Sequence, residues 1–416
     1  MGAALRSSCF SPDASTASFE TARSVAVEIA PPRGRIETIP VSAALDRVLA
    51  KPVIAPNSLP PFDQAAMDGY AVRLAGLADM PSILPVAGQT DAGDPLDVLF
   101  PATAHRIMTG AALPRGTDTV VMQEQAIRQG GFIQLEAEIA RNTHIRRAGE
   151  DVGQGAVVLP QGRRIGWPEI ALISALGIEH VSVAAPLRLA IVTTGSELRR
   201  GGEVLQPGQI YDANGPMLAS LLRQADAEVA LSTIADDARS IARTLEVCAA
   251  TSDIVITTAG MAAGDKDHVH TAIGRVGGRL HVAGVAMKPG KPLALGRLGR
   301  ACFVGLPGNP QAVAFGALAF VRPMVSALLG ETPAARLTAM PVFPCLNESL
   351  RTELVPVRLG FEQGRLTAHR CGPGGSHRLM PMVAADAIAI VPPATTSADV
   401  RDGIEILPFD RQRGWR

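Results

Sequence analysis

The sequence predicts a multidomain α/β protein, in which a domain with a parallel β-sheet is joined to β-rich subdomains and a small C-terminal β-barrel. Three observations support this fold class. Strand and helix patterns alternate from residue 187 to about residue 330, short β-type runs broken by Gly and Pro fill residues 36–186, and short strands return after residue 331. With 416 residues, the chain has room for about two to four domains.

The α/β region begins with a mostly apolar run at residues 187–192, and an apolar helical stripe at Leu218, Leu221 and Leu222 follows. Alternating strands and helices are typical of βαβ units, whose parallel sheet is buried on both faces. Ligand sites in such sheets lie beyond the carboxyl ends of the strands. We therefore expect four loops to meet at one edge of the sheet: residues 194–197, 236–237, 258–260 and 306–310.

The flanking regions have a different pattern. Phe19, Ala22, Val25, Ala26 and Ile29 recur at helical spacing, and Pro31 and Pro32 end the helix. Turn residues about every ten positions then predict small β-rich modules, with a helix at residues 168–176 and Gly177 at its end. After residue 331 we expect a small barrel or sandwich, from the strands at residues 354–359, 366–369, 387–391 and 403–407.

Composition excludes several classes of protein. Lys and Arg total 39 and Asp and Glu total 39, so no net charge draws the chain to nucleic acid or to an anionic membrane. The five cysteines are scattered, which favours a reducing compartment. Residues 1–30 do not resemble a signal peptide, and the apolar stretch at residues 311–329 is interrupted by Arg322 and Pro323, so we expect a buried helix and a cytoplasmic protein.

A basic turn at residues 288–292, Lys-Pro-Gly-Lys-Pro, is the first candidate site. Lys288 and Lys291 bring two ammonium groups and free backbone amides into one turn, which suits a phosphate or another oxyanion. The spacing of the glycines and Pro292 exclude a P-loop. An ordinary basic turn stays open as the alternative.

Two Gly-rich or Pro-rich loops follow predicted strands. Gly260 and Gly264 lie in a loop that lets backbone approach a ligand ahead of a helix, although no dinucleotide fingerprint is present. A plain turn with Asp267 as helix cap is equally consistent with this loop. The other loop, with Pro307, Gly308 and Pro310, is stiff enough to form a ligand wall.

Carboxylates recur at loop positions: Asp68, Asp151, Glu197, Asp237 and Asp267. Such oxygen ligands suit Mg²⁺, which keeps several waters and bridges protein to substrate phosphate. Each acid alone is equally well a helix cap or a surface charge, so only their convergence makes a site. His268 and His270 face different ways on a helix, and we interpret them as structural.

Read together, the loops resemble those of the molybdopterin molybdenumtransferases, the family of MoeA and the gephyrin E-domain. The resemblance runs from about residue 18 to the C-terminus, and its most specific element is FDQAAMDGYA at residues 62–71, close to the family's FDNSAMDGYA. Other motifs occur in the family's order, at residues 107–111, 147–151, 194–198, 210–214, 260–267, 287–292 and 306–310.

The resemblance implies an elongated homodimer of four-subdomain chains. Residues 15–34 would form a helix packed on the α/β domain, and residues 35–55 with 156–185 would form subdomain I, which links the parts and dimerises. Subdomain II would be residues 56–155, the molybdopterin-binding α/β subdomain III residues 186–330, and the barrel, subdomain IV, residues 331–416. The Asp68 segment would reach the α/β domain of the partner subunit.

The implied reaction takes adenylylated molybdopterin and molybdate with magnesium, inserts molybdenum at the dithiolene sulfurs and releases AMP. By resemblance, Lys288, Lys291, Arg351 and Ser376 would hold molybdate, a role that suits cations on a dianion. Gly260, Gly264, Pro307, Gly308 and Pro310 would line the substrate site. Glu197, Asp237 and Asp267 would hold magnesium, and Asp68, Thr109 and Asp151 would complete the catalytic set from the partner.

The chain departs from the family where Ala65, Ala262 and Ala312 stand in place of the usual Ser, and Ala213 in place of a frequent Ser. Each change removes a hydroxyl worth about 1–2 kcal/mol if it bonded substrate. The charged positions survive, so we expect an active enzyme. The alternatives are an adenylyltransferase-like activity, a paralogue with altered substrate and a non-catalytic scaffold like gephyrin. Transient contacts with the adenylyltransferase and recipient molybdoenzymes are also implied.

Overall fold

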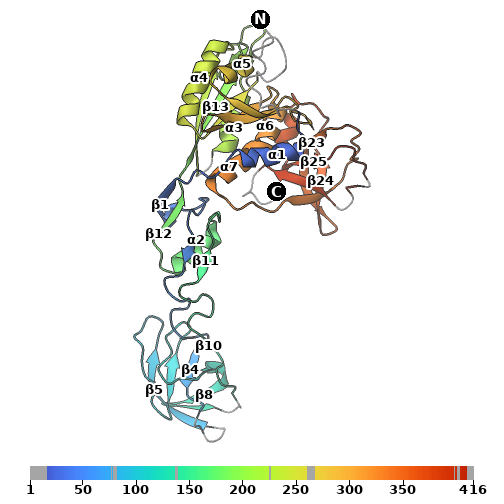
Figure 1. Cartoon of the computed structure of the whole chain (residues 1–416). Helices are drawn as coiled ribbons and strands as arrows, with labels where there is room; N and C mark the ends of the chain where they lie inside the picture. The colour runs from blue at the N-terminus through green and yellow to red at the C-terminus, as the bar shows by residue number, and fades with distance from the viewer. Residues whose placement is uncertain are drawn as a thin grey trace.

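The protein is elongated in the computed structural model (Figure 1). The α/β body and the C-terminal β-domain lie together at one end, a small region of short strands lies in the middle, and a second β-domain lies at the far end. The structure describes residues 16–75, 77, 82–135, 139–223, 226–259, 268–397, 399–400 and 403–409.

A six-stranded sheet in the order β16-β13-β17-β21-β20-β18 forms the α/β body. Its strands are β13 (Leu187–Thr194), β16 (Ala227–Ile234), β17 (Ile254–Thr258), β18 (Arg279–Ala283), β20 (Ala294–Leu298) and β21 (Ala301–Leu306). The first four strands are parallel, as predicted, whereas β20 and β18 add an antiparallel edge. The turn at Gly299 and Arg300 is too short for a crossover helix, so β20 and β21 must run antiparallel.

Helices cover both faces of this sheet, so its strands are buried on both sides. One face packs with α1 (Phe19–Glu28), α3 (Asn214–Leu222), α6 (Pro310–Gly316) and α7 (Arg322–Leu329), and the other packs with α4 (Ala238–Thr251) and α5 (His268–Arg275). Side chains of β17 alternate between the two cores: Ile254 and Ile256 enter one and Val255 the other.

The N-terminal helix lies against residues 300 positions later in the chain (Figure 1). Its N-cap is Ser18, whose hydroxyl accepts from Thr21 N at 3.1 Å. Phe19 then packs edge-on against Phe320, with ring centroids 5.5 Å apart. The helix is thereby part of the core of the α/β body.

The apolar run Pro310–Leu329 is long and apolar enough to cross a membrane, but 78% of its most apolar window is buried inside the protein. It forms one continuous helical rod in which the π-helical turn η3 (Ala317–Val321) joins α6 to α7. Pro323 has no backbone N–H, so it cannot donate a hydrogen bond to a carbonyl of the preceding turn. A π-helical turn accommodates this missing bond without ending the helix. Among the described residues this is a core helix, as the sequence predicted.

The C-terminal strands close into a five-stranded barrel. They are β22 (Leu337–Pro341), β23 (Thr352–Glu362), β24 (Arg365–Arg370), β25 (Ala387–Val391) and β26 (Ile404–Pro408), with the short helix α8 (Met380–Val383) between β24 and β25. The ring closes because β23 pairs with both β24 and β25. The predicted small barrel is therefore confirmed.

The middle region consists of short strand pairs around a small core. Its elements are β1 (Ile36–Pro40), η1 (Val41–Ala43), β2 (Val53–Ile54), β11 (Val157–Leu159), α2 (Trp167–Ala175) and β12 (His180–Ala184). Leu49, Ile165 and Ile173 are buried in its centre. Gly177 adopts φ +73° just after α2, the conformation that lets glycine end a helix.

The far domain is a six-stranded sheet in the order β7-β4-β6-β5-β9-β8, with η2 (Gln123–Gln125) and a small pair beside it. The strands are β3 (Gln64–Ala65), β4 (Gly69–Val72), β5 (Ser82–Thr90), β6 (Ala104–Ile107), β7 (Thr119–Met122), β8 (Ala126–Gln129), β9 (Phe132–Leu135) and β10 (Ile145–Arg146). Gly69 is required here, because a Cβ would lie 1.9 Å from the carbonyl oxygen of Val121.

Candidate functional site

The carboxyl ends of the four parallel strands lie in a row, as predicted. Thr194 pairs in register with Ile234, and Thr258 pairs with Leu306. Ala259 N then donates to the Leu306 carbonyl at 3.0 Å, and the Asn214 side-chain amide donates to the Gly308 carbonyl at 2.7 Å. The loops after β16, β13, β17 and β21 therefore begin side by side.

Asp237 follows β16 and is the N-cap of α4. Its Oδ1 accepts from Ser240 N at 2.8 Å and from Arg239 N at 3.1 Å. These bonds, led by those with Ser240, hold the pKa of Asp237 below its usual value, and nearby His268 lowers it further. The cap that the sequence left open as an alternative is thus present. The Asp237 carboxylate is nonetheless exposed.

Glu197 follows β13 in a loop tied to a second segment. The short strands β14 (Leu198–Arg199) and β15 (Ile210–Tyr211) pair in parallel, and Ile210 N donates to the Glu197 carbonyl at 2.9 Å. The Glu197 carboxylate folds back over Gly195, where a Cβ would lie 2.8 Å from its oxygens. The side chain is exposed at the same edge as Asp237.

Three polar residues at this edge were not among the predicted site residues. Asp212 accepts from the Thr193 hydroxyl at 2.9 Å and from Gly215 N at 3.0 Å, which fixes the start of α3. Asn214 donates across to Gly308, and its buried Oδ1 has no partner among the described residues. His268, interpreted as structural, begins α5 and lies close enough to Asp237 to affect that acid's pKa. The motif at residues 210–214 was the available signal for the first two.

The basic turn projects from the α/β body toward the barrel. It starts in β19 (Met287–Lys288), which pairs in parallel with the first residues of β23, so that Lys288 lies opposite Glu353. Val285 N donates to the Lys291 carbonyl at 2.9 Å, which closes the turn. Gly290 adopts φ +112°, a conformation that other residues rarely take. Both lysine side chains are exposed.

Arg351 lies beside this turn, because Thr352 N donates to the Ala286 carbonyl at 2.9 Å. The loop that carries it is held by Asn347, a buried amide. Its Nδ2 donates to the carbonyls of Arg351 and Pro392, each at 2.8 Å, and its Oδ1 accepts from the Ser349 hydroxyl at 2.7 Å. The guanidinium of Arg351 is therefore presented on a rigid loop.

Ser376 reaches the same place from the loop between β24 and β25. Gln311 N, at the start of α6, donates to the Ser376 carbonyl at 3.1 Å, and its side-chain amide donates to the Arg378 carbonyl at 2.6 Å. The barrel loop is thus fastened to the helix that follows Pro307, Gly308 and Pro310. All predicted molybdate-binding residues lie around the contact between the α/β body and the barrel.

The cations gathered there are not neutralised. Across the part of the chain that the structure describes, the side chains of Lys288, Lys291 and Arg351 make no hydrogen bond or ion pair. Glu353 is the nearest acid along the strand, and it lies 3.9 Å from the guanidinium of Arg370. Two ammonium groups and a guanidinium on rigid backbone can bind a tetrahedral dianion by charge-assisted hydrogen bonds.

The carboxylate set fits magnesium only together with a substrate. No group of three His, Cys, Asp or Glu side chains with metal-ligand geometry occurs among the described residues. Glu197 and Asp237, at adjacent strand ends, can supply one oxygen each. Mg²⁺ is usually bound by one or two carboxylates with waters and substrate phosphates, so this donor set suits it. Asp267, Gly260 and Gly264 lie outside the described residues, and their roles stay predictions.

The far domain carries the remaining predicted residues. Asp68 accepts from Thr109 N at 2.8 Å and from the Thr109 hydroxyl at 2.7 Å, both at Oδ1. The hydroxyl and then the amide of Thr109 hold the pKa of Asp68 below its usual value, so the exposed acid is ionised at neutral pH. Asp68 and Thr109 therefore form one unit.

Asp63 holds the loop that carries Asp151 close to the segment that carries Asp68. Its carboxylate accepts from Ala148 N at 2.8 Å and from Arg147 at 2.6 Å, and Asp151 N donates to the Leu59 carbonyl at 3.1 Å. The amide of Ala148 is the main reason why the pKa of Asp63 is lowered. Asp63 thus joins its own loop to the loop at residues 147–148 by hydrogen bonds. Asp68 and Asp151 are exposed.

One chain does not bring both sets of residues together. Asp68 precedes β4 in the far domain, whereas Asp237 precedes α4 at the opposite end of the molecule (Figure 1). Within this chain the Asp68 unit therefore lies away from the carboxyl edge of the α/β sheet.

Known proteins match the chain along nearly its whole length. Residues 17–177 match the MoeA N-terminal region, residues 190–327 a probable molybdopterin binding domain, and residues 346–409 the MoeA C-terminal region. The molybdopterin molybdenumtransferase of Haemophilus influenzae is 33% identical over 403 residues, which cover 95% of this chain and 99% of that protein.

Two further relatives point to the same family. Molybdopterin molybdenumtransferase 2 of Mycobacterium tuberculosis is 36% identical over 373 residues, covering 85% of this chain and 90% of that protein. The crystal structure of the molybdopterin biosynthesis protein MoeA of Pyrococcus horikoshii superposes with a TM-score of 0.80 at 26% identity, covering 94% and 99% of the two chains. The chain therefore belongs to the molybdopterin molybdenumtransferase (MoeA) family, transferases of molybdenum cofactor biosynthesis.

Proposed function

We propose that this protein inserts molybdenum from molybdate into adenylylated molybdopterin and releases AMP. The observation that carries the proposal is the group of unneutralised cations, Lys288, Lys291 and Arg351, at the edge of a probable molybdopterin-binding domain. Molybdate needs such a cluster, because a protein without net positive charge must bind a dianion through a local arrangement.

The cation cluster would hold molybdate while the pterin end lies along the carboxyl edge of the sheet. Lys288 and Lys291 would bind its oxygens from one side, and Arg351 and Ser376 from the barrel side. The stiff loop Pro307–Pro310 would form the wall between them. Fixed backbone on all sides keeps the oxyanion close to the dithiolene sulfurs that replace its oxygens.

The acids would act at the pyrophosphate of the adenylylated substrate. Water adds to the phosphorus, the phosphoanhydride P–O bond breaks, and AMP leaves as molybdopterin keeps its own phosphate. Glu197 and Asp237 would hold magnesium there, with Asp267, and that ion would neutralise charge on the phosphate bridge. The Asp237 carboxylate is exposed although it caps α4, so it is accessible to the ion.

The working unit would be a homodimer. Asp68, Thr109 and Asp151 lie at the end of the molecule remote from Asp237, so we propose that they serve the α/β domain of the partner subunit. The ionised, hydrogen-bonded state of Asp68 suits a group that positions water or a substrate hydroxyl. We place the enzyme in the cytoplasm, with transient contacts to the molybdopterin adenylyltransferase and to recipient molybdoenzymes.

Two substitutions test the assignment. Asp237→Ala and Lys291→Ala are each expected to reduce molybdate-dependent AMP release at least about a hundredfold, because each removes a charge from the reacting region. The measurement is AMP formed from adenylylated molybdopterin, with circular dichroism and size-exclusion chromatography to check the fold.

Matched controls are Asp236→Ala, next to Asp237, and Lys51→Ala, in the middle region, which should keep normal turnover. Normal AMP release by both the Asp237→Ala and the Lys291→Ala protein would contradict the proposed catalytic function. Formation of adenylylated molybdopterin from molybdopterin and ATP would favour the adenylyltransferase alternative instead.

A further inference from the structure

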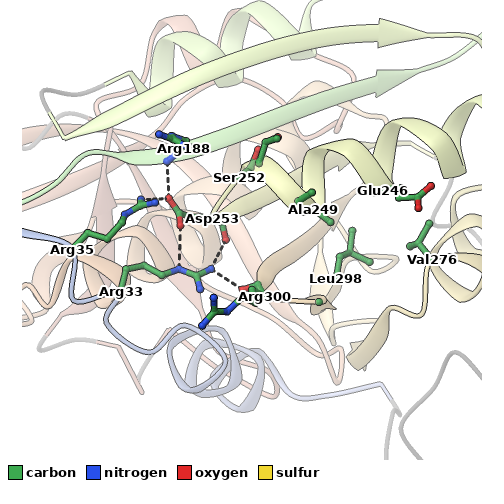
Figure 2. A pocket seen from close by; sticks show the side chains of 13 residues that line it. Arg33, Arg35, Arg188, Glu246, Ala249, Ser252, Asp253, Val276, Leu298 and Arg300 are labelled. Atoms are coloured by element: carbon green, nitrogen blue, oxygen red, sulfur yellow. Dashed lines mark hydrogen bonds and ion pairs between the residues drawn. The ribbon is translucent and has the colours of Figure 1, made fainter.

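A cavity of about 610 Å³ opens at the amino-terminal edge of the α/β sheet (Figure 2). Arg188 lies at the start of β13, Asp253 directly precedes β17, and Arg300 directly precedes β21. The proposed molybdate and pterin site lies at the opposite edge, a distance of ~17 Å along the five residues of β17. The cavity is therefore separate from that site, and its size is typical of a small-molecule site.

Part of the positive charge around this cavity has a structural role. The Asp253 carboxylate, 8% exposed, pairs with Arg33 at 3.2 Å and with Arg35, and it accepts from Arg188 N at 2.8 Å. Arg33 also donates to the Arg300 carbonyl at 2.7 Å. These contacts attach the segment after α1 to the sheet, and they neutralise the charge of the Asp253 carboxylate.

Two guanidinium groups remain available. Arg300 donates no hydrogen bond among the described residues, and Arg188 has only the exposed Glu228 at 4.0 Å, which is a weak pair. The Arg35 side chain, although paired, is still 43% exposed. Arginine planes of this kind bind phosphate oxygens in pairs. The cavity thus has an anion-binding end.

The other end of the cavity is apolar. Figure 2 shows Ala249, Leu298 and Val276 on the side away from the arginines, with Glu246 beyond them. Ala249 and Val276 pack on the core between α4, α5 and the sheet, so this wall is rigid. Glu246 repels an anion from that end, which gives a bound ligand one orientation.

We propose that this cavity binds a small organic phosphate monoester, with its phosphate at the arginine-lined end and its apolar body on the wall formed by Ala249, Val276 and Leu298. Inorganic phosphate alone fills only the cationic end. A neutral aromatic compound contacts only the apolar wall and makes no charge-assisted hydrogen bond, so it binds too weakly to be detected at millimolar concentration. The site thereby selects molecules that carry both groups.

Calorimetric titration of the full-length protein with phenyl phosphate tests this, in buffer free of phosphate and sulfate and up to about 5 mM ligand, which mostly fills a site with Kd ~1 mM. The protein should carry Lys291→Ala, so that the proposed molybdate site does not contribute. Phenyl phosphate should bind at least about tenfold more tightly than inorganic phosphate, because the ring leaves water. Benzyl alcohol should not bind.

Adding Arg188→Ala and Arg300→Ala should weaken phenyl phosphate binding at least about tenfold, since the arginine-lined end then loses its two available guanidinium groups. Arg243→Ala, an exposed arginine of α4 outside the cavity, should leave it unchanged. Both cavity arginines are exposed, so the variant is expected to unfold like the wild-type protein. Equal binding by the arginine variant, or no binding by the parent, would overturn the proposal.

Discussion

Asp68 illustrates how one neighbouring residue sets the charge of an exposed acid. Both donors of Thr109 meet the same carboxylate oxygen, so they favour the ionised form. Because its pKa is lowered, the carboxylate keeps these bonds above its ordinary pKa and loses them as the pH falls through the lowered value. The pair can act as a fixed negative charge throughout the physiological range.

The first prediction follows from this pair. Thr109→Val removes the hydroxyl donor, so the pKa of Asp68 should rise toward its ordinary value, which ¹³C NMR titration of the Asp68 carboxyl carbon measures directly. The acid limb of the pH–rate profile should move to higher pH by the same amount. Thr143→Val, at a half-buried threonine of the same domain, is the control. An unmoved Asp68 titration would show that the hydroxyl does not set this pKa.

At the scale of elements, the segment between β22 and β23 shows how a loop is made rigid enough to present a charge. Asn347 is 5% exposed and joins the Arg351 carbonyl, the Ser349 hydroxyl and the Pro392 carbonyl. Its backbone also pairs with Thr395 in both directions, at 2.9 and 3.1 Å. The end of the barrel is thereby closed beside the cation cluster.

Asn347→Ala should therefore destabilise the protein by about 1–3 kcal/mol, because buried carbonyls lose their donor. The KM for molybdate should also rise while kcat changes less, since Arg351 loses its fixed position. Urea unfolding and steady-state kinetics measure the two effects. Ser349→Ala, which removes one hydroxyl of the same network, should have a smaller effect on both. A loss of stability without any change in KM would show that Asn347 stabilises the fold but does not position Arg351 for substrate.

Sequence patterns predicted the elements well where one physical rule dominated. Buried parallel strands read as apolar runs, and β17 and β21 lie where the sequence predicted alternating strands and helices. The antiparallel strand β18 was not recognised, because the residues Arg279–Ala283 alternate over a short stretch. The direction in which strands pair, such as the antiparallel pairing of β20 with β21 and β18, depends on the geometry of the connecting turns rather than on the apolar pattern.

The site was less predictable than the fold. The motif FDQAAMDGYA contains two acids, and only the structure shows that Asp63 is bound to Arg147, 84 residues later. Likewise, nothing local to His268 indicates that Asp237 lies near it. The spacing of residues in the sequence does not reveal roles that depend on tertiary contacts. Charged residues in loops, by contrast, can be proposed as site residues from their chemistry alone.

At the scale of the molecule, the junction between the middle region and the α/β body depends on Arg164. Its guanidinium pairs with Asp226 at 2.8 Å and with both oxygens of Glu331 at 2.9 Å, and Glu331 also accepts from the Ser326 hydroxyl. The Asp226 side chain is fully buried. This network joins the middle region to the α/β body.

Arg164→Met should lower the free energy of unfolding by about 3–5 kcal/mol, since a buried carboxylate loses its partner. Differential scanning calorimetry measures the change. Arg188→Met is the control: its side chain is 63% exposed and its partner Glu228 is 71% exposed, so loss of this pair should cost about 1 kcal/mol or less. Equal costs for the two variants would mean that burial does not strengthen the Arg164 network.

The central claim is that the site combines the far domain of one molecule with the α/β edge of another. Asp68→Asn and Asp237→Ala proteins, each inactive alone, should regain AMP release when they are unfolded and refolded together. Random pairing gives mixed dimers with one intact site each, so about a quarter of wild-type activity is expected. Refolding each variant alone is the control. A mixed sample that forms dimers but releases no AMP would contradict the shared site.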